Sequence, residues 1–259
     1  MAVVAGLTKE ESKDDDVTVD DFLGGAVKLV QPKHGYRVSM DTVLLAASIP
    51  AKAGDKVLEP GPGSGGAALC LAERVPGVYV TGIEMQDAMV DLALRNIELN
   101  AQHDFVNVRQ GCVTTRPDWL NAGTFDHVMV NPPYLANGKA IRPPEEGKGL
   151  AHMDSSANLK DWVNFCIDMV KPKGTISIVY RADRADEVIA RLHRRVGELK
   201  LMPFWPRDGV AAKRVIIQGR KAVNGAMSIL PGLSLHGTEE RYTKEAEEIL
   251  RHGKALNMG

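Results

Sequence analysis

The sequence lacks the features that mark membrane, secreted and metal-binding proteins. No apolar run in its 259 residues is long enough to cross a membrane, and residues 1–7 are too short for a secretion signal and lack its basic start. The three cysteines, Cys70, Cys112 and Cys166, are far apart and do not have the spacing of a metal site. We therefore expect a cytoplasmic protein that works in a reducing environment without a metal or a membrane.

An excess of positive charge is also missing. The formal net charge is −1, with 32 lysine and arginine residues against 33 aspartate and glutamate residues. This balance neither supports nor excludes a nucleic-acid partner, because a local basic patch is enough to bind one. The hydrophobic fraction of 44% is ordinary for a globular protein, and a chain of this length can bury a sizeable core.

Predicted strands and helices alternate through the middle of the chain. The expected strands are 56–59, 78–84, 106–110, 125–130, 175–180, 200–205 and 214–218, and the expected helices are 67–74, 87–100, 159–170 and 185–195. This alternation predicts an α/β fold built on a doubly wound sheet. We expect seven strands, mostly parallel, with helices on both faces and an antiparallel hairpin at the C-terminal edge.

No internal repeat and no clear linker divides the chain, so we expect one main domain over residues 51–259. Residues 1–19 are polar and acidic and are expected to form a flexible tail. Residues 20–50, which we call the preface, are expected to pack against the main domain beside its functional site. Within the preface we expect a short hairpin over residues 23–32 and a helix that starts at Ser39 or Asp41.

The most informative stretch is Asn131-Pro132-Pro133-Tyr134, which directly follows the predicted strand 125–130. A planar amine, such as adenine N6 or a glutamine amide, is a poor nucleophile because its lone pair is delocalised. The Asn131 side-chain oxygen and the Pro132 carbonyl can accept both of its hydrogens and direct the lone pair at a methyl donor. The prolines stiffen these acceptors, and Tyr134 offers a flat face for stacking. The motif therefore indicates N-methylation of a planar amine.

A glycine-rich turn joins the first predicted strand to the first helix: Glu59-Pro60-Gly61-Pro62-Gly63-Ser64-Gly65. Glycines allow the backbone to approach a ligand closely. A dinucleotide site would favour Gly-x-Gly-x-x-Gly with a pyrophosphate at the helix start, and the Glu59 carboxylate would repel that group. The acid instead suits a cationic ligand without phosphate, such as S-adenosylmethionine.

The ends of the next two strands supply further candidate cofactor contacts. Glu84 ends the second strand, where an acid accepts hydrogen bonds from ribose hydroxyls, and Met85 is expected to pack on the adenine. The third strand runs into Cys112 and Val113, whose backbone groups are candidates to bind the adenine amine. The alternative is that Cys112 is simply a small buried residue.

These landmarks, in this order, resemble the class I S-adenosylmethionine-dependent methyltransferases, with a Rossmann-like fold, over roughly residues 56–218. The segments 21–25, 31–41, 43–46, 151–153 and 242–246 are similar to the bacterial tRNA1(Val) adenine-N6 methyltransferases. That family methylates an adenosine next to the anticodon and releases S-adenosylhomocysteine. The resemblance implies a catalytic role for residues 131–134. It also implies cofactor contacts from Glu59, Gly61, Gly63 and Glu84, with Tyr36, Arg37 and Ser39 covering the cofactor.

Basic residues near these motifs are candidates to bind RNA phosphates. A Gly/Pro-rich loop over residues 137–149 follows the catalytic motif and is expected to grip the substrate. Taken singly, each of these basic residues is more often an ordinary surface charge. The candidates are Lys139, Arg142 and Lys148 in that loop, Arg207, Lys213 and Arg214 near the last hairpin, and Lys33 and Arg37 in the preface.

The sequence thus predicts methyl transfer from S-adenosylmethionine to the N6 amine of an adenosine in the anticodon-loop region of a tRNA. The same motif chemistry suits a protein glutamine-N5 methyltransferase, although those enzymes usually carry a larger N-terminal domain than this preface. Another rRNA or DNA adenine-N6 methyltransferase is also compatible. A dinucleotide-dependent oxidoreductase and a catalytically silent binding module are disfavoured by the glycine spacing and by residues 131–134. Monomer and homodimer both stay open.

Overall fold

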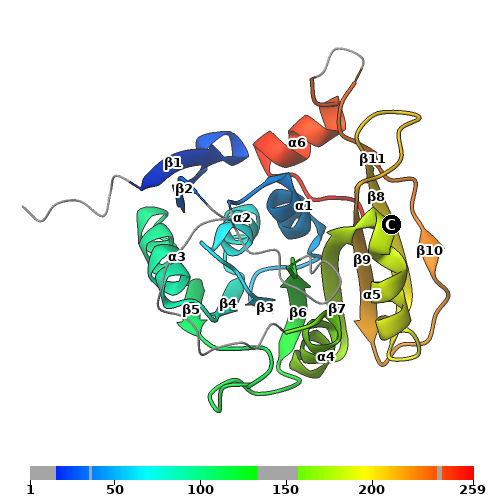
Figure 1. Ribbon diagram of the computed structural model, residues 1–259, viewed down its shortest axis with the longest axis horizontal. Helices are drawn as coiled ribbons and strands as arrows, with labels where there is room; N and C mark the ends of the chain where they lie inside the picture. The colour runs from blue at the N-terminus through cyan, green and yellow to red at the C-terminus, as the bar shows by residue number, and fades with distance from the viewer. Residues whose placement is uncertain (1–15, 35–36, 134–156, 238–240) are drawn as a thin grey trace, which may run out of the picture.

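A nine-stranded sheet forms the centre of the protein in the computed structural model, which describes residues 16–34, 37–133, 157–237 and 241–259. The strand order is β10-β8-β9-β7-β6-β3-β4-β5, with β11 also paired to β8 (Figure 1). The strands are β3 (Lys56–Pro60), β4 (Tyr79–Glu84), β5 (Val106–Gln110), β6 (Phe125–Val130), β7 (Val170–Arg181), β8 (Val196–Trp205), β9 (Arg214–Lys221), β10 (Ser228–Ile229) and β11 (Leu233–Ser234).

The expected seven-stranded pattern is confirmed as the body of this sheet. Strands β5, β4, β3, β6 and β7 are parallel, and β9 runs antiparallel to both β7 and β8. The two further strands, β10 and β11, have two residues each and pair with β8 at the edge. Pairs this short leave no period-2 hydrophobic pattern, which explains why the sequence did not predict them.

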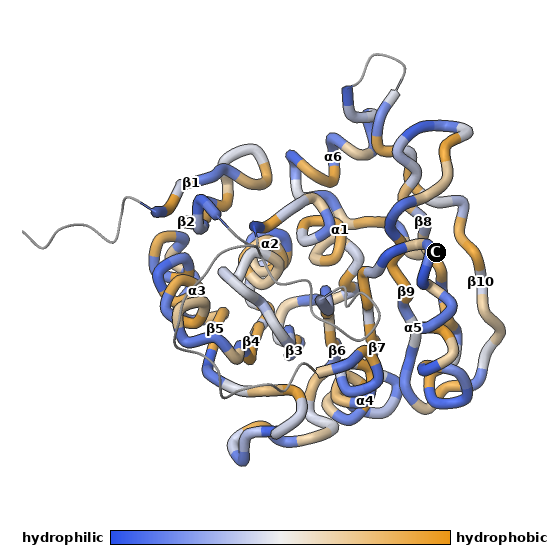
Figure 2. Tube along the Cα trace, viewed as in Figure 1, coloured by the Kyte–Doolittle hydropathy of each residue, from blue (hydrophilic) through white to orange (hydrophobic). Residues whose placement is uncertain are grey.

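The central strands are apolar along most of their length because helices cover both faces of the sheet. Two hydrophobic clusters result, one on each face. The first involves α1 (Met40–Ser48), α2 (Gly66–Arg74), α3 (Asp87–Leu99) and α6 (Lys244–His252); the second involves α4 (Leu159–Met169) and α5 (Ala185–Leu192). Figure 2 shows the alternation of hydrophilic and hydrophobic residues that an amphipathic helix such as α3 requires.

The preface contains an antiparallel hairpin of β1 (Val17–Phe22) and β2 (Val27–Pro32), joined by the short helix η1 (Leu23–Gly25). We expected the hairpin within residues 23–32, but its first strand lies earlier and includes residues 17–19 that the sequence assigned to the acidic tail. The physical reason is that β1 is only half-buried, so it can carry Thr18, Asp20 and Asp21 among its apolar residues without preventing strand pairing.

Two asparagines, one in α3 and one at its C-cap, attach this hairpin to the main domain. The amide of Asn96 is fully buried; its Oδ1 accepts from the Val30 N–H at 2.7 Å and its Nδ2 donates to the Val30 carbonyl at 3.0 Å. Asn100, one turn later, makes the same pair of bonds with Lys28 at 2.9 and 2.7 Å. The two carboxamides thus take the place of a neighbouring strand and satisfy the free edge of β2.

Helix α6 closes the fold on the preface, and the sequence did not predict it. Thr243 caps the first turn by accepting from the Ala246 N–H, and Gly253 ends the helix with a positive φ of 64°. The helix packs against η1 and α1 (Figure 1). The approach is close, since a Cβ on Gly24 would lie 2.8 Å from the Arg251 carbonyl oxygen.

Within the described ranges no helix has the length and apolar character needed to cross a membrane. The same part of the chain holds no cluster of three or more histidine, cysteine or acidic side chains arranged around a possible metal ion.

Candidate active site

The predicted site residues gather where the parallel strands end. Glu59 and Pro60 end β3, Glu84 ends β4, and Asn131 directly follows β6. Strand β3 lies between β4 and β6, so the chain order reverses beside it. In open α/β sheets, ligands bind outside the carboxyl ends of the strands at such a switch point.

The first glycine of the turn between β3 and α2, Gly61, cannot be replaced by a residue with a side chain. Gly61 has φ of 66°, and a Cβ there would lie 2.9 Å from Cη2 of Trp162 on α4. Both the backbone conformation and the contact therefore exclude a side chain at this residue. Gly63 and Gly65 also have positive φ values, of 56° and 85°, and the turn presents bare backbone at the sheet edge.

Glu84 is buried beside this turn, with its carboxylate directed at backbone amides. Its two oxygens accept from the Gly63 N–H at 3.1 Å and from the Gln86 N–H at 3.0 Å. Each carboxylate oxygen can accept a second hydrogen bond, so the group retains capacity for ribose hydroxyls. Met85 follows with 40% of its surface exposed, and its packing on the adenine stays a prediction.

Glu59 is an ionisable residue that is buried in the site, where its charged form is unfavourable. Its side chain is 4% exposed, and Oε2 is buried without a hydrogen-bond partner among the described residues. Burial raises the pKa of Glu59 from 4.5 to about 8; a hydrogen bond from the Ala68 backbone opposes the shift, and the charge of Glu84 adds to it. An orphaned carboxylate oxygen at this edge fits a cationic ligand. Glu59, Gly61, Gly63 and Glu84 are thus the residues that would hold S-adenosylmethionine.

Cys112 and Val113 lie on the segment that follows β5, at the same edge. The Cys112 thiol is half-buried and lies 3.1 Å from the Thr114 hydroxyl. Burial alone would raise the pKa of Cys112, but hydrogen bonds from Thr114 and Thr115 outweigh it and lower the pKa. The side chain is therefore polar in its contacts, unlike the small buried residue that we considered as the alternative.

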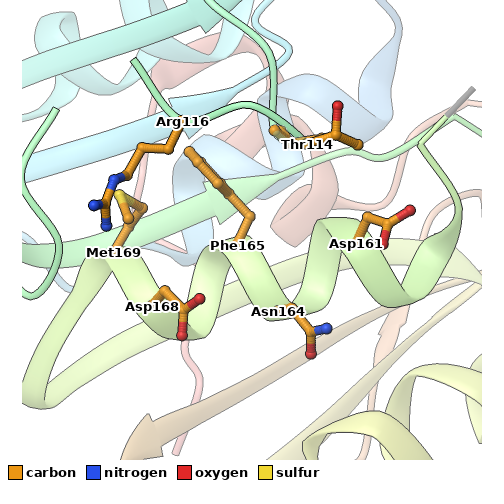
Figure 3. Close-up of a pocket in the computed structure, with 8 residues that line it drawn as sticks. Thr114, Arg116, Asp161, Asn164, Phe165, Asp168 and Met169 are labelled. Carbon is orange, nitrogen blue, oxygen red and sulfur yellow. The ribbon is translucent and has the colours of Figure 1, made fainter. Parts of the chain in front are cut away.

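A cavity of about 280 Å³ separates this segment from α4. Val113 forms part of its wall. Figure 3 shows Phe165 and Met169 reaching from α4 toward Thr114 and Arg116, whereas Asn164 points away from them.

The catalytic motif begins at the carboxyl end of β6, as the sequence predicted. Asn131 is half-buried, Pro132 is buried and Pro133 is exposed. Tyr134 lies outside the described residues, as do the candidates Tyr36, Lys139, Arg142 and Lys148. The catalytic roles of the four motif residues therefore stay predictions.

Arg37 and Ser39 make contacts within the preface. The Arg37 guanidinium donates to the Asp20 carboxylate at 2.6 Å, to the Thr18 hydroxyl at 2.9 Å and to the Pro32 carbonyl at 2.7 Å, so it holds the hairpin together. The Ser39 hydroxyl caps α1 by accepting from the Asp41 N–H at 3.3 Å. Cofactor contacts from Arg37 and Ser39 stay predictions, since neither bonds to the glycine turn.

Residue 38, between these two, does touch the cofactor region. A Cβ added to Gly66, the first residue of α2, would lie 2.7 Å from Cγ2 of Val38. The preface therefore packs directly against the helix that follows the glycine turn.

The candidate RNA contacts among the described residues differ in exposure. Lys33, Arg207 and Lys213 are exposed. Arg214 is half-buried, and its Nε donates to the Asp41 carboxylate at 2.7 Å, which ties β9 to the first turn of α1. This ion pair is a structural role that the sequence did not reveal, because its partners are 173 positions apart.

Two residues that support the site were not identified from sequence. Trp162 covers Gly61, and Asn96 donates from Nδ2 to the Ser64 carbonyl at 2.9 Å, which fixes the glycine turn. Asn96 lies within the predicted helix 87–100, at helical spacing with Met89, Leu92, Ala93 and Leu99, and that spacing was the available signal. Trp162 lies on a predicted helix, but nothing in its spacing indicates a contact with Gly61.

Comparison with known proteins agrees with this geometry. The family model described as N-6 DNA Methylase matches residues 38–184, which include the preface helix, the glycine turn and Asn131-Pro132-Pro133-Tyr134. Two curated relatives carry the name tRNA1(Val) (adenine(37)-N6)-methyltransferase. The protein of Bacteroides thetaiotaomicron is 25% identical over 229 residues, which cover 86% of this chain and 93% of that protein. The protein of Aeromonas hydrophila is 29% identical over 154 residues, and this match covers 59% of this chain and 63% of that protein.

Solved structures share the fold. A protein of Agrobacterium tumefaciens, described as a predicted O-methyltransferase, aligns with a TM-score of 0.70 at 24% identity over 84% of this chain and 98% of that one. The tRNA (m1A58) methyltransferase of Aquifex aeolicus aligns with a TM-score of 0.54 at 16% identity over 75% and 73%. The expected Rossmann-like methyltransferase fold is thereby confirmed.

Proposed function

Because the chain belongs to the N-6 DNA methylase family, and is an S-adenosylmethionine-dependent N-methyltransferase, we propose that its substrate is an adenosine in the anticodon-loop region of a tRNA, methylated at N6. The observation that carries the proposal is the position of Asn131 and Pro132. They follow β6, next to β3 and its glycine turn, where a base amine and a methyl donor can meet. The names of the curated relatives support tRNA as the polymer.

The cofactor site relies on shape and charge. Bound S-adenosylmethionine supplies a methyl group made electrophilic by its sulfonium. Glu59 provides a buried carboxylate for the cationic part of this ligand, and Glu84 accepts from the ribose hydroxyls. Gly61 and Gly63 let the backbone approach the ligand without side chains in between.

The substrate site relies on hydrogen-bond acceptors. The Asn131 side-chain oxygen and the Pro132 carbonyl accept hydrogen bonds from the two N–H groups of the adenine N6 amine. These bonds turn the lone pair of the amine toward the methyl group. The methylated amine then loses a proton to water, so no strong base is needed. Tyr134 is proposed to stack on the adenine. A base in a folded loop must first leave its stack to enter such a site.

An adenine in DNA is the second candidate substrate, because the matching family model carries the description N-6 DNA Methylase. The motif recognises the amine and not the polymer, so the choice depends on surfaces outside residues 131–134. We place the tRNA reaction in the cytoplasm, with the enzyme acting as a monomer or a homodimer.

The test is methyl transfer from labelled S-adenosylmethionine to total tRNA from a strain that lacks this gene, followed by nucleoside mass spectrometry. We expect new N6-methyladenosine. Asn131→Ala should reduce the rate at least 100-fold and leave cofactor affinity unchanged, because it removes a base acceptor. Asn121→Ala, at an exposed loop asparagine, is the matched control and should keep full activity.

Two outcomes would overturn the proposal. Unlabelled tRNA together with labelled DNA would make DNA the substrate, and labelling of a release-factor Gly-Gly-Gln segment would indicate protein glutamine-N5 methylation. Loss of cofactor affinity in Asn131→Ala, equal to its loss of rate, would refute the assignment of Asn131 as a base acceptor.

A further inference from the structure

A second cavity, of about 340 Å³, lies outside the site described above. Its volume is at the lower end of the range for small-ligand pockets. Three segments far apart in sequence form its wall: the first turns of α1, the facing ends of β8 and β9, and the residues after β11. The residues that the argument uses are Leu44, Phe204, Lys213, Arg214, Leu235 and His236.

The cavity opens at the same edge of the sheet as the catalytic motif. Val130 of β6 pairs with Ile178 of β7, and three residues further along β7 Arg181 pairs with Arg214 of β9. Strand β9 is therefore two strand spacings, or about 10 Å, from the strand that ends at Asn131. Strand β9 lies three strands along the sheet from β3 and its glycine turn, although Ser39, a predicted cofactor contact, lies in the cavity wall. We place the cavity next to the site where the target base would be held.

The inner part of the cavity is apolar and contains an aromatic ring. Leu44, Phe204 and Leu235 are all buried. His236 adds a second flat ring, which is stacked on Tyr242 at a centroid distance of 5.0 Å and an angle of 18°. The Nδ1 atom of His236 is buried without a hydrogen-bond partner among the described residues. A flat ligand with both an apolar face and polar edges would satisfy this combination.

The rim of the cavity is positively charged. Its one acidic residue, Asp41, is paired with Arg214 at 2.7 Å. Lys213 is exposed just before β9 and leaves a net positive charge in the cavity lining. Arg207 lies outside the lining, on the connection between β8 and β9, beside the exposed Asp208, which accepts from the Ser234 hydroxyl at 2.5 Å. An anionic group next to a flat ring is the chemistry of a nucleotide, whose phosphate would face the rim and whose base would enter the cavity.

We propose that this cavity binds the base of a nucleotide that neighbours the target adenosine in the RNA substrate. The base lies against His236, which is half-buried, and Lys213 attracts the adjoining phosphate. This inference rests on the proposed RNA methylation and adds a second base-binding subsite to it.

The test measures steady-state kinetics of the full chain with a full-length tRNA transcript and with transcripts that carry one abasic ribose beside the target. We expect His236→Ala to raise the KM for tRNA roughly tenfold, by loss of base contacts, with kcat changed less than twofold. One abasic position should raise the wild-type KM by a similar factor and add little in His236→Ala, because both changes remove the same contact. His103→Ala, at an exposed histidine, is the matched control and should change neither constant.

Lys213→Ala tests the rim without disturbing the interior. For tRNA binding by this variant, the slope of log affinity against log salt concentration should be smaller in magnitude than the wild-type slope by about one. Lys52→Ala, at an exposed lysine on the opposite edge of the sheet, is the control and should keep the wild-type slope. Cofactor affinity and the unfolding midpoint, measured for every variant, show that each one folds.

The results separate the two claims. If wild-type protein methylates no tRNA, the proposed function fails. If it methylates tRNA while both variants keep the wild-type KM and salt slope, or if the abasic and His236→Ala effects simply multiply, the subsite is refuted. A fall in kcat without a change in KM would also refute it, because the cavity would then hold the target base itself.

Discussion

Protonation of Glu59 should control cofactor affinity. The structure buries this carboxyl and raises its pKa to about 8, so at pH 7 about nine tenths of the free protein carries a neutral Glu59. A cationic cofactor favours the ionised form, and its binding must therefore release a proton below pH 8. Affinity for S-adenosylmethionine should rise as the pH rises toward 8 and then level off.

The size of this effect follows from the same pKa. If binding returns the pKa of Glu59 to near its ordinary value, the dissociation constant should fall roughly tenfold between pH 6.5 and pH 8. Calorimetry in two buffers of different ionisation enthalpy would report the released proton directly. The α-amino group of the cofactor also titrates near pH 8. The pH dependence that remains in Glu59→Gln belongs to that amino group, because the glutamine amide cannot ionise.

The free protein gives an independent check with a defined sign. The unfolded chain ionises Glu59 above pH 4.5, whereas the folded protein keeps it protonated up to about pH 8. The stability that this group contributes is therefore present at low pH and is lost as the pH rises between those two values. In urea unfolding, the free energy of unfolding of Glu59→Gln minus that of the wild type should increase from pH 5 to pH 8. Parallel pH profiles for the two proteins, in binding and in unfolding, would refute the reasoning.

Four further substitutions test the supports of the site and of the fold. Asn96→Ala should lower the free energy of unfolding by about 3 kcal/mol, because it leaves buried backbone groups unpaired, and Asn100→Ala, near the surface, by about 1 kcal/mol; equal losses in urea titrations would contradict this. Glu84→Ala should weaken S-adenosylmethionine binding tenfold or more in calorimetry, and an unchanged affinity would exclude the ribose contact. Thr243→Ala should cost about 1 kcal/mol in the same unfolding assay through loss of the α6 cap, and no loss would show that the cap is dispensable.

Much of the fold could be predicted because its signals are local. The alternation of strands with helices, the glycine turn after β3 and the acid at the end of β4 are each readable within a few residues. The tetrapeptide that starts at Asn131 likewise carries its chemistry in its own side chains. Parallel strand ends meet at one edge, so these local signals also predict which residues gather there.

The missed features depend on partners that are distant in sequence. Arg214 pairs with Asp41 across 173 positions, and Arg37 donates to groups of the hairpin; their contacts with RNA and with the cofactor stay predictions. A long basic side chain can reach many groups, and only the folded chain decides among them. Helix α6 had readable signals in Thr243 and Gly253, and it was missed although they agree with its observed ends.

The amide of Asn96 has a consequence for the order of events during synthesis. The β1–β2 hairpin leaves the ribosome first, yet the helix that completes the edge of β2 follows 66 positions later. The hairpin therefore has to wait, with an open edge, until α3 has emerged and formed.

The opposite end of the chain finishes the same region. Helix α6 packs on η1 only after residues 244–252 have been made, and the Leu256 N–H then donates to the Ala47 carbonyl at 2.9 Å. The β1–β2 hairpin and its connection η1 thus receive their final contacts from a helix that is translated much later. Until α3 has formed, the nascent chain exposes the unpaired edge of β2, a stage at which association with other chains or capture by a chaperone competes with folding.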